Sequence, residues 1–188
     1  MTTVTARVAV GDPAPTDRLL GASVVAGPLV YLAGDSTFAV RGWQADGAGG
    51  VVQVVGSILY ALTLLAVAAR LPRASRLRAA LVLALLVGLA GNVAYGFDAI
   101  HVSLGDVSLV DRTGAATLIK PLGLFFPLSL LLGGAALART GRRVPAMLVV
   151  LGALVFPVAH IANVPWLAVA GDAALVLGFG GSVWDRRE

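Results

Sequence analysis

The sequence predicts an all-α membrane protein: a bundle of six transmembrane helices with both ends of the chain in the cytoplasm. Of its 188 residues, 58% are hydrophobic and only 13% are charged, whereas a soluble domain has about 25% charged residues. Six apolar runs are each long enough to cross a hydrocarbon core of ~30 Å. Arginines gather in short clusters between these runs, where they indicate which loops stay in the cytoplasm.

The predicted first span is the least regular of the six. Residues 1–17 are polar and are expected to form a disordered cytoplasmic tail. The apolar run that follows, 19–38, reaches about 20 residues only if it continues through Asp35, and Gly27-Pro28 is expected to kink it. Because basic residues precede this run, a cleaved signal peptide is the competing interpretation, although Asp35 makes a poor cleavage region.

The other five spans are regular. Pro72 follows the second span, and Pro165 begins the sixth, at a position where a helix tolerates proline. Together the six spans form one domain, 18–184, followed by a short cytoplasmic terminus, 185–188. The remaining spans are predicted at 51–71, 77–101, 115–138, 144–163 and 165–184.

The basic residues set the predicted orientation. With the N-terminus inside, eleven of the fourteen Lys and Arg residues lie on the cytoplasmic side, most of them in the turns 70–78 and 139–143. Arg41 and Arg112 lie outside, and Lys120 falls within a span. This asymmetry follows the positive-inside rule. The net charge of +4 therefore indicates topology, and no basic stripe or motif suggests a nucleic acid partner.

Polar side chains within the spans are predicted to gather in the outer half of the bilayer. At a rise of about 1.5 Å per residue, the alternating direction of the helices places nearly all of them near the outer ends, while the inner halves are Leu, Val and Ala. Polar groups in a span usually face the bundle interior or an aqueous cavity. We therefore expect one outward-facing polar cavity. Its expected members are Asp35, Gln53, Ser57, Asn92, Tyr95, Lys120, His160, Asn163 and Asp172.

Asp172 is the strongest candidate for a catalytic acid, since it lies about two turns below the outer surface. A carboxyl group at that depth loses hydration, which favours its protonated form. Asp35 is comparably deep, and Asp98 is a third candidate nearer the interface. A protonated acid in an apolar pocket can protonate an alkene or an epoxide, and aromatic faces can stabilise the resulting carbocation. The aromatic residues expected to line this substrate pocket are Tyr31, Tyr60, Tyr95, Phe97, Phe125, Phe126, Phe156 and Trp166.

With these aspartates among aromatic residues, the chain resembles the small membrane-embedded terpene cyclases of actinobacterial secondary metabolism, including those that cyclise prenylated indoles. The resemblance covers the whole chain in length and number of spans, and it rests on Asp35, Asp98 and Asp172. It implies a lipophilic isoprenoid substrate and an acid-initiated cyclisation without metal or cofactor. The resemblance also implies the inner membrane of an actinobacterium as the location. Abundant Ala, Val, Leu, Gly and Arg with a single Lys is typical of a high-GC bacterial genome.

Other functions remain open. Proton-coupled carriers also use intramembrane Asp, Lys and His, although the apolar inner half and the lack of an internal repeat offer no pathway to the cytoplasm. Binding of a b-type haem, with His101 and His160 as axial ligands, is a third hypothesis. A retinal-type Schiff base has only Lys120 in its favour. The absence of cysteines excludes disulfides and thiolate metal sites.

Structural roles are the alternative for these residues. Asp35 and Lys120 can form an ion pair between the first and fourth spans. Asn92 and Asn163 are suited to hydrogen bonds between helices, and His101 is suited to the membrane interface. The many Gly and Ala residues are expected to form close helix contacts.

Overall fold

A computed structural model confirms the all-α, six-helix prediction. It describes residues 14–42 and 47–184. Six of its helices are long and apolar enough to cross a membrane, so the chain is a multi-pass membrane protein. The helices are α1 Pro15–Arg41, α2 Ala48–Ala69, α3 Arg76–Ser103, the 3-10 helices η1 Leu109–Asp111 and η2 Gly114–Leu118, α4 Ile119–Arg139, α5 Arg143–Ile161 and α6 Pro165–Trp184.

The predicted boundaries agree with these helices to within a few residues, with two exceptions. α1 begins inside the predicted tail, at Pro15, because a proline fits the first turn of a helix, where its missing N–H is not needed. The fourth predicted span begins as the 3-10 helix η2 and becomes α-helical only at Ile119. The rest of the predicted tail, the loop residues 43–46 and the terminus 185–188 lie outside the described residues.

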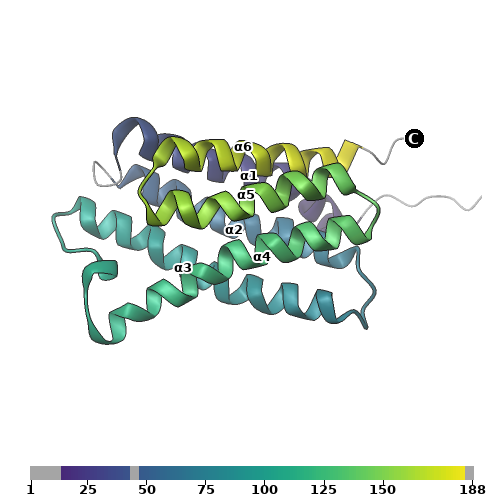
Figure 1. Ribbon diagram of the computed structural model, residues 1–188, viewed down its shortest axis with the longest axis horizontal. Helices are drawn as coiled ribbons and strands as arrows, with labels where there is room; N and C mark the ends of the chain where they lie inside the picture. The colour runs from purple at the N-terminus through teal and green to yellow at the C-terminus, as the bar shows by residue number, and fades with distance from the viewer. Residues whose placement is uncertain (1–13, 43–46, 185–188) are drawn as a thin grey trace, which may run out of the picture.

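The six α-helices form a closed ring. Each packs against its neighbours in the sequence, α6 returns to pack against α1, and α2 also contacts α4 across the interior. Figure 1 shows the helices running along the long axis of the molecule, with the start of α1 and the end of α6 at the same end. Both ends of the membrane domain therefore lie on one side, which is the arrangement that the charge count requires.

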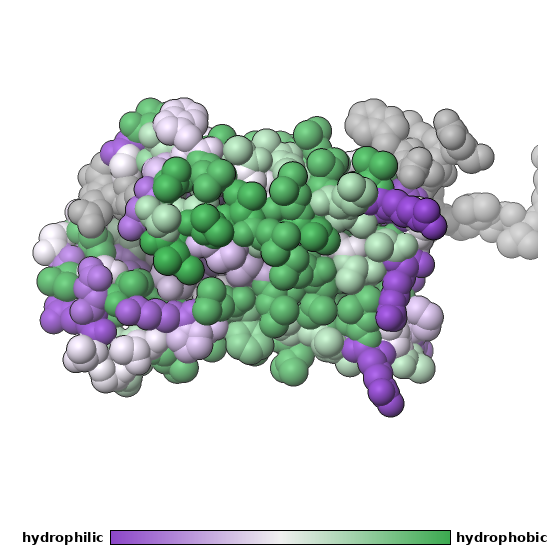
Figure 2. All heavy atoms as spheres, in the orientation of Figure 1, coloured by the Kyte–Doolittle hydropathy of each residue, from purple (hydrophilic) through white to green (hydrophobic). Residues whose placement is uncertain are grey.

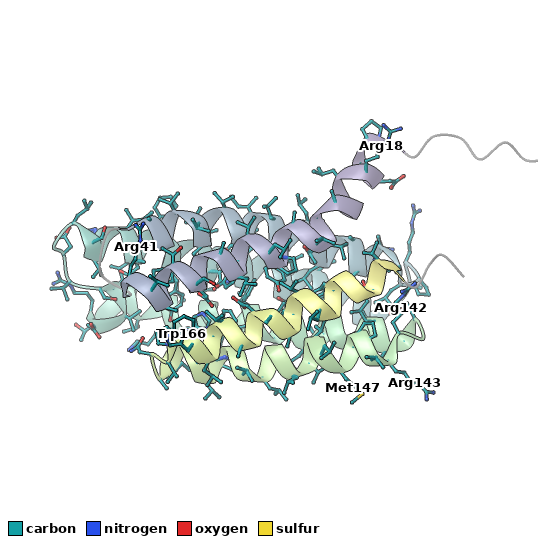
Figure 3. All side chains as sticks on the ribbon, turned by 90° about the horizontal axis from the view of Figure 1, so that it is seen from above. Arg18, Arg41, Arg142, Arg143, Met147 and Trp166 are labelled. Atoms are coloured by element: carbon teal, nitrogen blue, oxygen red, sulfur yellow. The ribbon has the colours of Figure 1, made fainter. Side chains whose placement is uncertain are left out.

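The arginines mark that shared end. Arg18, Arg142 and Arg143 lie there, whereas Arg41 and Trp166 lie at the other end of the bundle (Figure 3). We call these the arginine end and the opposite end. Between them, the face seen in Figure 2 carries a broad apolar belt with polar residues on either side. Such a belt is the surface expected of a protein embedded in lipid.

α1 is bent, and its first turns leave the bundle (Figure 3). Residues 14–19 are exposed, and buried positions begin only at Ser23. Pro28 lies inside the helix. A proline has no N–H, and its ring displaces the carbonyl four residues earlier, here that of Val24, so the helix bends. The course of α1 agrees with the kink predicted at Gly27-Pro28.

Small residues allow the helices to approach closely, as predicted. A Cβ atom at Gly27 of α1 would overlap the backbone of Leu59 on α2, and a Cβ atom at Gly91 of α3 would overlap the backbone of Leu122 on α4. A larger residue at either position would have to separate two helices. Both helix pairs contribute side chains to the candidate site.

Candidate functional site

Three titratable side chains from three helices meet in the half of the bundle nearer the opposite end. Asp35 comes from α1, His160 from the last turn of α5 and Asp172 from α6. His160 Nε2 lies 3.1 Å from Asp35 Oδ2, and the carboxyl groups of Asp35 and Asp172 are close enough to interact electrostatically. The structure thus brings together three of the predicted site residues, with Asp35 in the middle. We call them the His–Asp–Asp chain.

His160 is held in one orientation by its own helix. Its Nδ1 lies 2.8 Å from the carbonyl oxygen of Phe156, one turn earlier. Its ring also stacks on that of Phe156, with centroids 3.9 Å apart and an angle of 21° between the planes. Because a carbonyl oxygen only accepts hydrogen bonds, Nδ1 must carry a proton. Nε2 then faces Asp35, and a hydrogen bond there requires one proton, held either by Nε2 or by the carboxyl group.

The two carboxyl groups also need a proton between them. A carboxylate only accepts hydrogen bonds, so two carboxyl groups can bond to each other only when one is protonated. Asp172 Oδ2 is buried and receives no hydrogen bond from an N–H or O–H group of the described residues. It interacts electrostatically with the carboxyl group of Asp35. Because two like charges buried side by side are costly, we expect the pair to hold one acidic proton away from bulk water.

Tyr31 links this chain to two further helices. Its Oη accepts a hydrogen bond from Asn92 Nδ2 of α3 at 3.0 Å and another from Gln53 Nε2 of α2 at 3.4 Å. Tyr31 stands one turn before Asp35 on α1, so both side chains face the interior. The two amides hold the tyrosine beside the carboxyl pair. A hydrogen bond between helices, the structural alternative for Asn92, is what the structure contains.

Aromatic rings pack directly against the His–Asp–Asp chain. The centroid of the Tyr31 ring lies 5.6, 5.5 and 5.8 Å from those of Tyr60, Phe126 and Phe156. Phe126 and Phe156 are 5.2 Å apart, and Tyr60 and Phe179 are 5.8 Å apart. Most of these pairs are tilted or edge-to-face, which is favourable for aromatic rings. We call these five residues the aromatic cluster.

The aromatic cluster fills the interior, which corrects the expectation of an open, outward-facing cavity. Tyr31, Tyr60, Phe126 and Phe179 are each at most 1% exposed. The polar groups meet around packed rings, since the interior is narrow and the rings are large enough to close it. A hollow of about 350 Å³ lies instead on the surface between the end of α1 and the start of α2. It is lined by Ser36, Thr37, Val40, Arg41 and Ala48.

Asp98, the third predicted acid, does not join the site. Its carboxylate accepts hydrogen bonds from Ser108 Oγ at 2.5 Å and from the backbone N–H of Leu109 at 2.7 Å. Both donors belong to the segment between α3 and α4, where Ser108 caps η1. Asp98 therefore anchors this segment to α3, which is a structural role.

Four predicted members of the site point away from it. Lys120 and Asn163 are exposed, as are Phe125 at 36% and Trp166 at 65%. The ion pair considered between Lys120 and the buried Asp35 is not formed. Asn163 has a positive φ of 52° in the turn after α5, a conformation that asparagine tolerates. An exposed tryptophan at a helix end is typical of the membrane interface.

Three further predicted residues lie inside the bundle. Ser57 Oγ donates to the backbone carbonyl of Gln53, at 2.7 Å within the same helix. The ring of Tyr95 packs against Gly123 of α4. Tyr60 belongs to the aromatic cluster, and its buried Oη has no hydrogen-bond partner among the described residues. Of the three, only Tyr60 contributes to the candidate site.

Phe179 is the site residue that the sequence-based prediction missed. It stands seven residues after Asp172, about two helical turns, so both face the same side of α6. The seven-residue spacing from Asp172 could have identified Phe179 from the sequence. Phe126 was named as a possible pocket residue, and it is buried, whereas the adjacent Phe125 faces outward.

The two histidines are not arranged as a pair of haem ligands. His160 has one ring nitrogen on the carbonyl of Phe156 and the other on Asp35. His101 lies at the end of α3, where its Nε2 is 3.3 Å from Asp106 Oδ2 and both side chains are exposed. The interfacial position, the structural alternative for His101, agrees with this contact.

The chain matches no family model, no curated protein and no solved structure. Function is therefore inferred from the geometry of the site. That geometry combines a buried acidic proton, a histidine that contacts the acid pair and a wall of aromatic rings.

Proposed function

We propose that the protein is an integral membrane enzyme that uses the Asp35–Asp172 pair as a general acid to start cyclisation of a lipophilic, isoprenoid-type substrate. The observation that carries the proposal is the pairing of two buried carboxyl groups, each at most 2% exposed and close enough to interact, directly beside the aromatic cluster. Tyr31 and Tyr60 both interact electrostatically with the two aspartates, so acid and rings share one site. Acid and aromatic faces are the two components that a carbocation cyclisation needs.

The reaction balances without an oxidant or a metal. The proton of the carboxyl pair moves to an alkene carbon, or to an epoxide oxygen whose C–O bond then breaks, and a carbocation forms. The π electrons of a second double bond close a ring on that carbon. Loss of a proton from the final cation to the carboxylate restores the acid. The product is an isomer of the substrate. Because the rings of the aromatic cluster pack against one another in the structure, the substrate has to separate them when it binds, and the separated faces then stabilise the intermediate charge by cation–π contact.

The interior near the arginine end favours an enzyme over a proton-coupled carrier. Leu64, Leu137 and Val149 are fully buried there, and its hydroxyl groups bond to backbone carbonyls, as Thr63 of α2 does to the carbonyl of Ser23 on α1 at 2.6 Å. A carrier must open its site to both sides of the membrane. A site that is polar in one half only suits a substrate that arrives from the lipid or from one aqueous side.

The location follows from the same proposal. An isoprenoid substrate dissolves in the lipid, so an enzyme in the cytoplasmic membrane of a bacterium meets it without a soluble carrier. The composition of the chain supports a high-GC host such as an actinobacterium, in which cyclised isoprenoids belong to secondary metabolism. The partners in this proposal are the bilayer and the small-molecule substrate.

Removing the proton tests the acid directly. Membranes containing the protein are incubated with a prenylated indole and with its terminal epoxide, and cyclic products of unchanged mass are sought by chromatography and mass spectrometry. Asp172→Asn and Asp35→Asn keep the shape of the side chain but remove the acidic proton, so turnover should fall by ~10²–10⁴. The control is Asp106→Asn, an exposed carboxylate at the opposite end, which should keep normal turnover.

The melting temperature in detergent separates catalysis from folding. Both active-site variants should stay folded, because asparagine can still form hydrogen bonds at these positions. If both fold and retain near-normal turnover, or if the wild-type protein forms no cyclic isomer from either substrate, the proposed function is wrong.

A further inference from the structure

We infer that His160 is the proton port of the site: the residue through which the buried carboxyl pair exchanges protons with water at the opposite end of the bundle. The use of this port in catalysis rests on the proposed function. The port itself is a property of the His–Asp–Asp chain, and it can be measured without any substrate.

The chain of contacts is continuous. Nδ1 of His160 is committed to the carbonyl of Phe156, so the proton that moves is the one between Nε2 and Asp35 Oδ2, across 3.1 Å. Asp35 in turn interacts with Asp172. A proton can pass from the imidazole to Asp35 and from Asp35 to Asp172 by short transfers, after a small adjustment of the side chains that aligns these contacts.

The exposed fraction of the side chains decreases along the His–Asp–Asp chain, from His160 to the two aspartates. The side chain of His160 is 18% exposed and that of Asp35 is 2% exposed, and Asp172 is likewise 2% exposed. His160 stands one residue before the end of α5, on the turn that faces the opposite end. The imidazole is therefore the member of the chain that reaches the surface. It does so by its ring edge, whereas its Nε2 atom is buried, so proton uptake from water requires the ring to turn outward. Imidazole is also the side chain best suited to taking up and releasing protons near neutral pH.

Within residues 14–42 and 47–184, no other titratable group offers an equivalent route. The other titratable side chains that act on the carboxyl pair are Tyr31 of α1 and Tyr60 of α2, and both are fully buried. α3 and α4 present Asn92 and Phe126 to the site, neither of which carries a transferable proton. From α5, the titratable side chain that faces the carboxyl pair is His160 itself.

The arginine end does not provide water either. Leu64 and Leu137 are fully buried between the site and that end. Leu175, three residues after Asp172 on α6, is 1% exposed. An aliphatic layer excludes the water molecules that a second proton route would need. The geometry thus leaves one aqueous approach, past His160.

The absence of cysteines permits a direct test of access. His160→Cys and Ala74→Cys each introduce a single thiol, the second in the exposed turn at the arginine end. Proteoliposomes of known orientation are treated with a charged, membrane-impermeant thiol reagent. The cysteine at 160 should react from the side opposite to the one from which the cysteine at 74 reacts. If the cysteine at 160 reacts from the same side as the cysteine at 74, or does not react at all, the inference that His160 is the proton port is wrong.

Proton exchange provides the second test. Protonated carboxyl groups give an infrared band, and the part of it that is lost in Asp172→Asn belongs to the site. The rate at which this band shifts is measured after the detergent-solubilised protein is transferred into D₂O. His160→Gln keeps a polar side chain but cannot relay a proton, so exchange should slow by ~10²-fold, the lower range for loss of a positioned proton carrier. His101→Gln, the matched control at the same end, should exchange at the wild-type rate.

The sign of the change separates a port from a structural role. If His160 only supported the fold, its replacement would loosen the bundle and exchange would become faster. Unchanged or faster exchange in His160→Gln therefore refutes the inference. Should that variant fail to fold, His101→Gln leaves His160 as the single histidine. Its ¹⁵N-labelled imidazole should then show exchange with water, and a fully protected ring would refute the port. Both readouts hold whether or not the protein cyclises isoprenoids.

Discussion

The two halves of the bundle are built from the same six helices and differ in what those helices bury. Toward the arginine end the buried side chains are aliphatic, such as Val67, Leu81 and Leu137, with a few small hydroxyl groups. Toward the opposite end the same helices bury Asp35 and Asp172 together with amides and aromatic rings. We call these the arginine half and the site half.

The difference separates two tasks. The hydroxyl groups of the arginine half bond to nearby backbone carbonyls, as Thr63 does to Ser23 and to Leu59, so they cost little when buried. The site half joins carboxyl, imidazole and amide side chains of different helices, and a charge there lies in surroundings that are expensive for it. The arginine half therefore supplies a closed, stable base, and the site half carries the chemistry.

The largest expected effect concerns which half faces the cytoplasm. Reporter domains fused after Arg73 and after Arg142 should be active only in the cytoplasm, and a fusion after Asp106 only outside. The reason is the excess of arginine at the arginine end. The readout is all-or-none, using paired reporters that are active on one side each. An external location for the 70–78 turn would reverse the assignment of the two halves.

Shortening a leucine in the arginine half should cost stability but not activity. Leu137 is fully buried, and Leu→Ala in a packed core costs about 2–5 kcal/mol. Leu137→Ala should therefore lower the unfolding free energy in detergent by that amount while turnover per folded molecule is retained.

The matched control is Leu83→Ala, at a position 63% exposed in the same half. It should change stability by about 0.5 kcal/mol or less. Equal losses in the two variants would mean that the arginine half does not depend on its packed interior.

The sequence predicted the number of helices, their approximate ends and the half in which the polar groups lie. These follow from hydropathy and from the direction of each span, which set the depth of every residue. From depth alone, Asp35, Gln53, Asn92, His160 and Asp172 were expected at one level of the bundle, and the structure links Gln53 and Asn92 to Tyr31, and His160 to Asp35. The convergence of these side chains on one another then follows from the cost of exposing them to lipid.

The rotation of each helix about its axis was not predictable in the same way. In a membrane both the lipid-facing and the interior sides are apolar, so hydropathy does not distinguish Phe125 from Phe126. Lys120 and Asn163 lie at helix ends, where the interface hydrates them and no burial is required. The role of Asp98 depended on a partner, Ser108, in an irregular segment whose path no periodicity reveals.

Within the site half, the two tyrosine hydroxyl groups should differ in importance. Tyr31 Oη accepts hydrogen bonds from Asn92 and Gln53, so Tyr31→Phe leaves both amides without this acceptor. The cost should be about 1–3 kcal/mol of unfolding free energy. Tyr60→Phe removes a hydroxyl that has no hydrogen-bond partner among the described residues, so its stability should stay close to that of the wild type. Chemical denaturation of both variants in the same detergent gives the comparison. A larger loss in Tyr60→Phe would show that its hydroxyl has a partner of its own.

The smallest effect is expected at Asp98, a buried aspartate of the site half with a structural task. Asp98→Asn can still accept from the Leu109 N–H, and the new amide can donate to Ser108 Oγ, so only the contribution of the negative charge to these bonds is lost. The expected cost is about 0.5–1.5 kcal/mol, confined to the segment between α3 and α4. Hydrogen exchange of that segment should become faster while turnover stays normal. Asp172→Asn should give the reverse, with normal exchange in the segment and lost turnover. A loss of turnover in Asp98→Asn with the segment still protected would mean that burial in this half is enough to make an aspartate functional. The distinction between an acid held beside aromatic rings and a carboxylate saturated by hydrogen bonds would then fail, and the site would have to extend along α3.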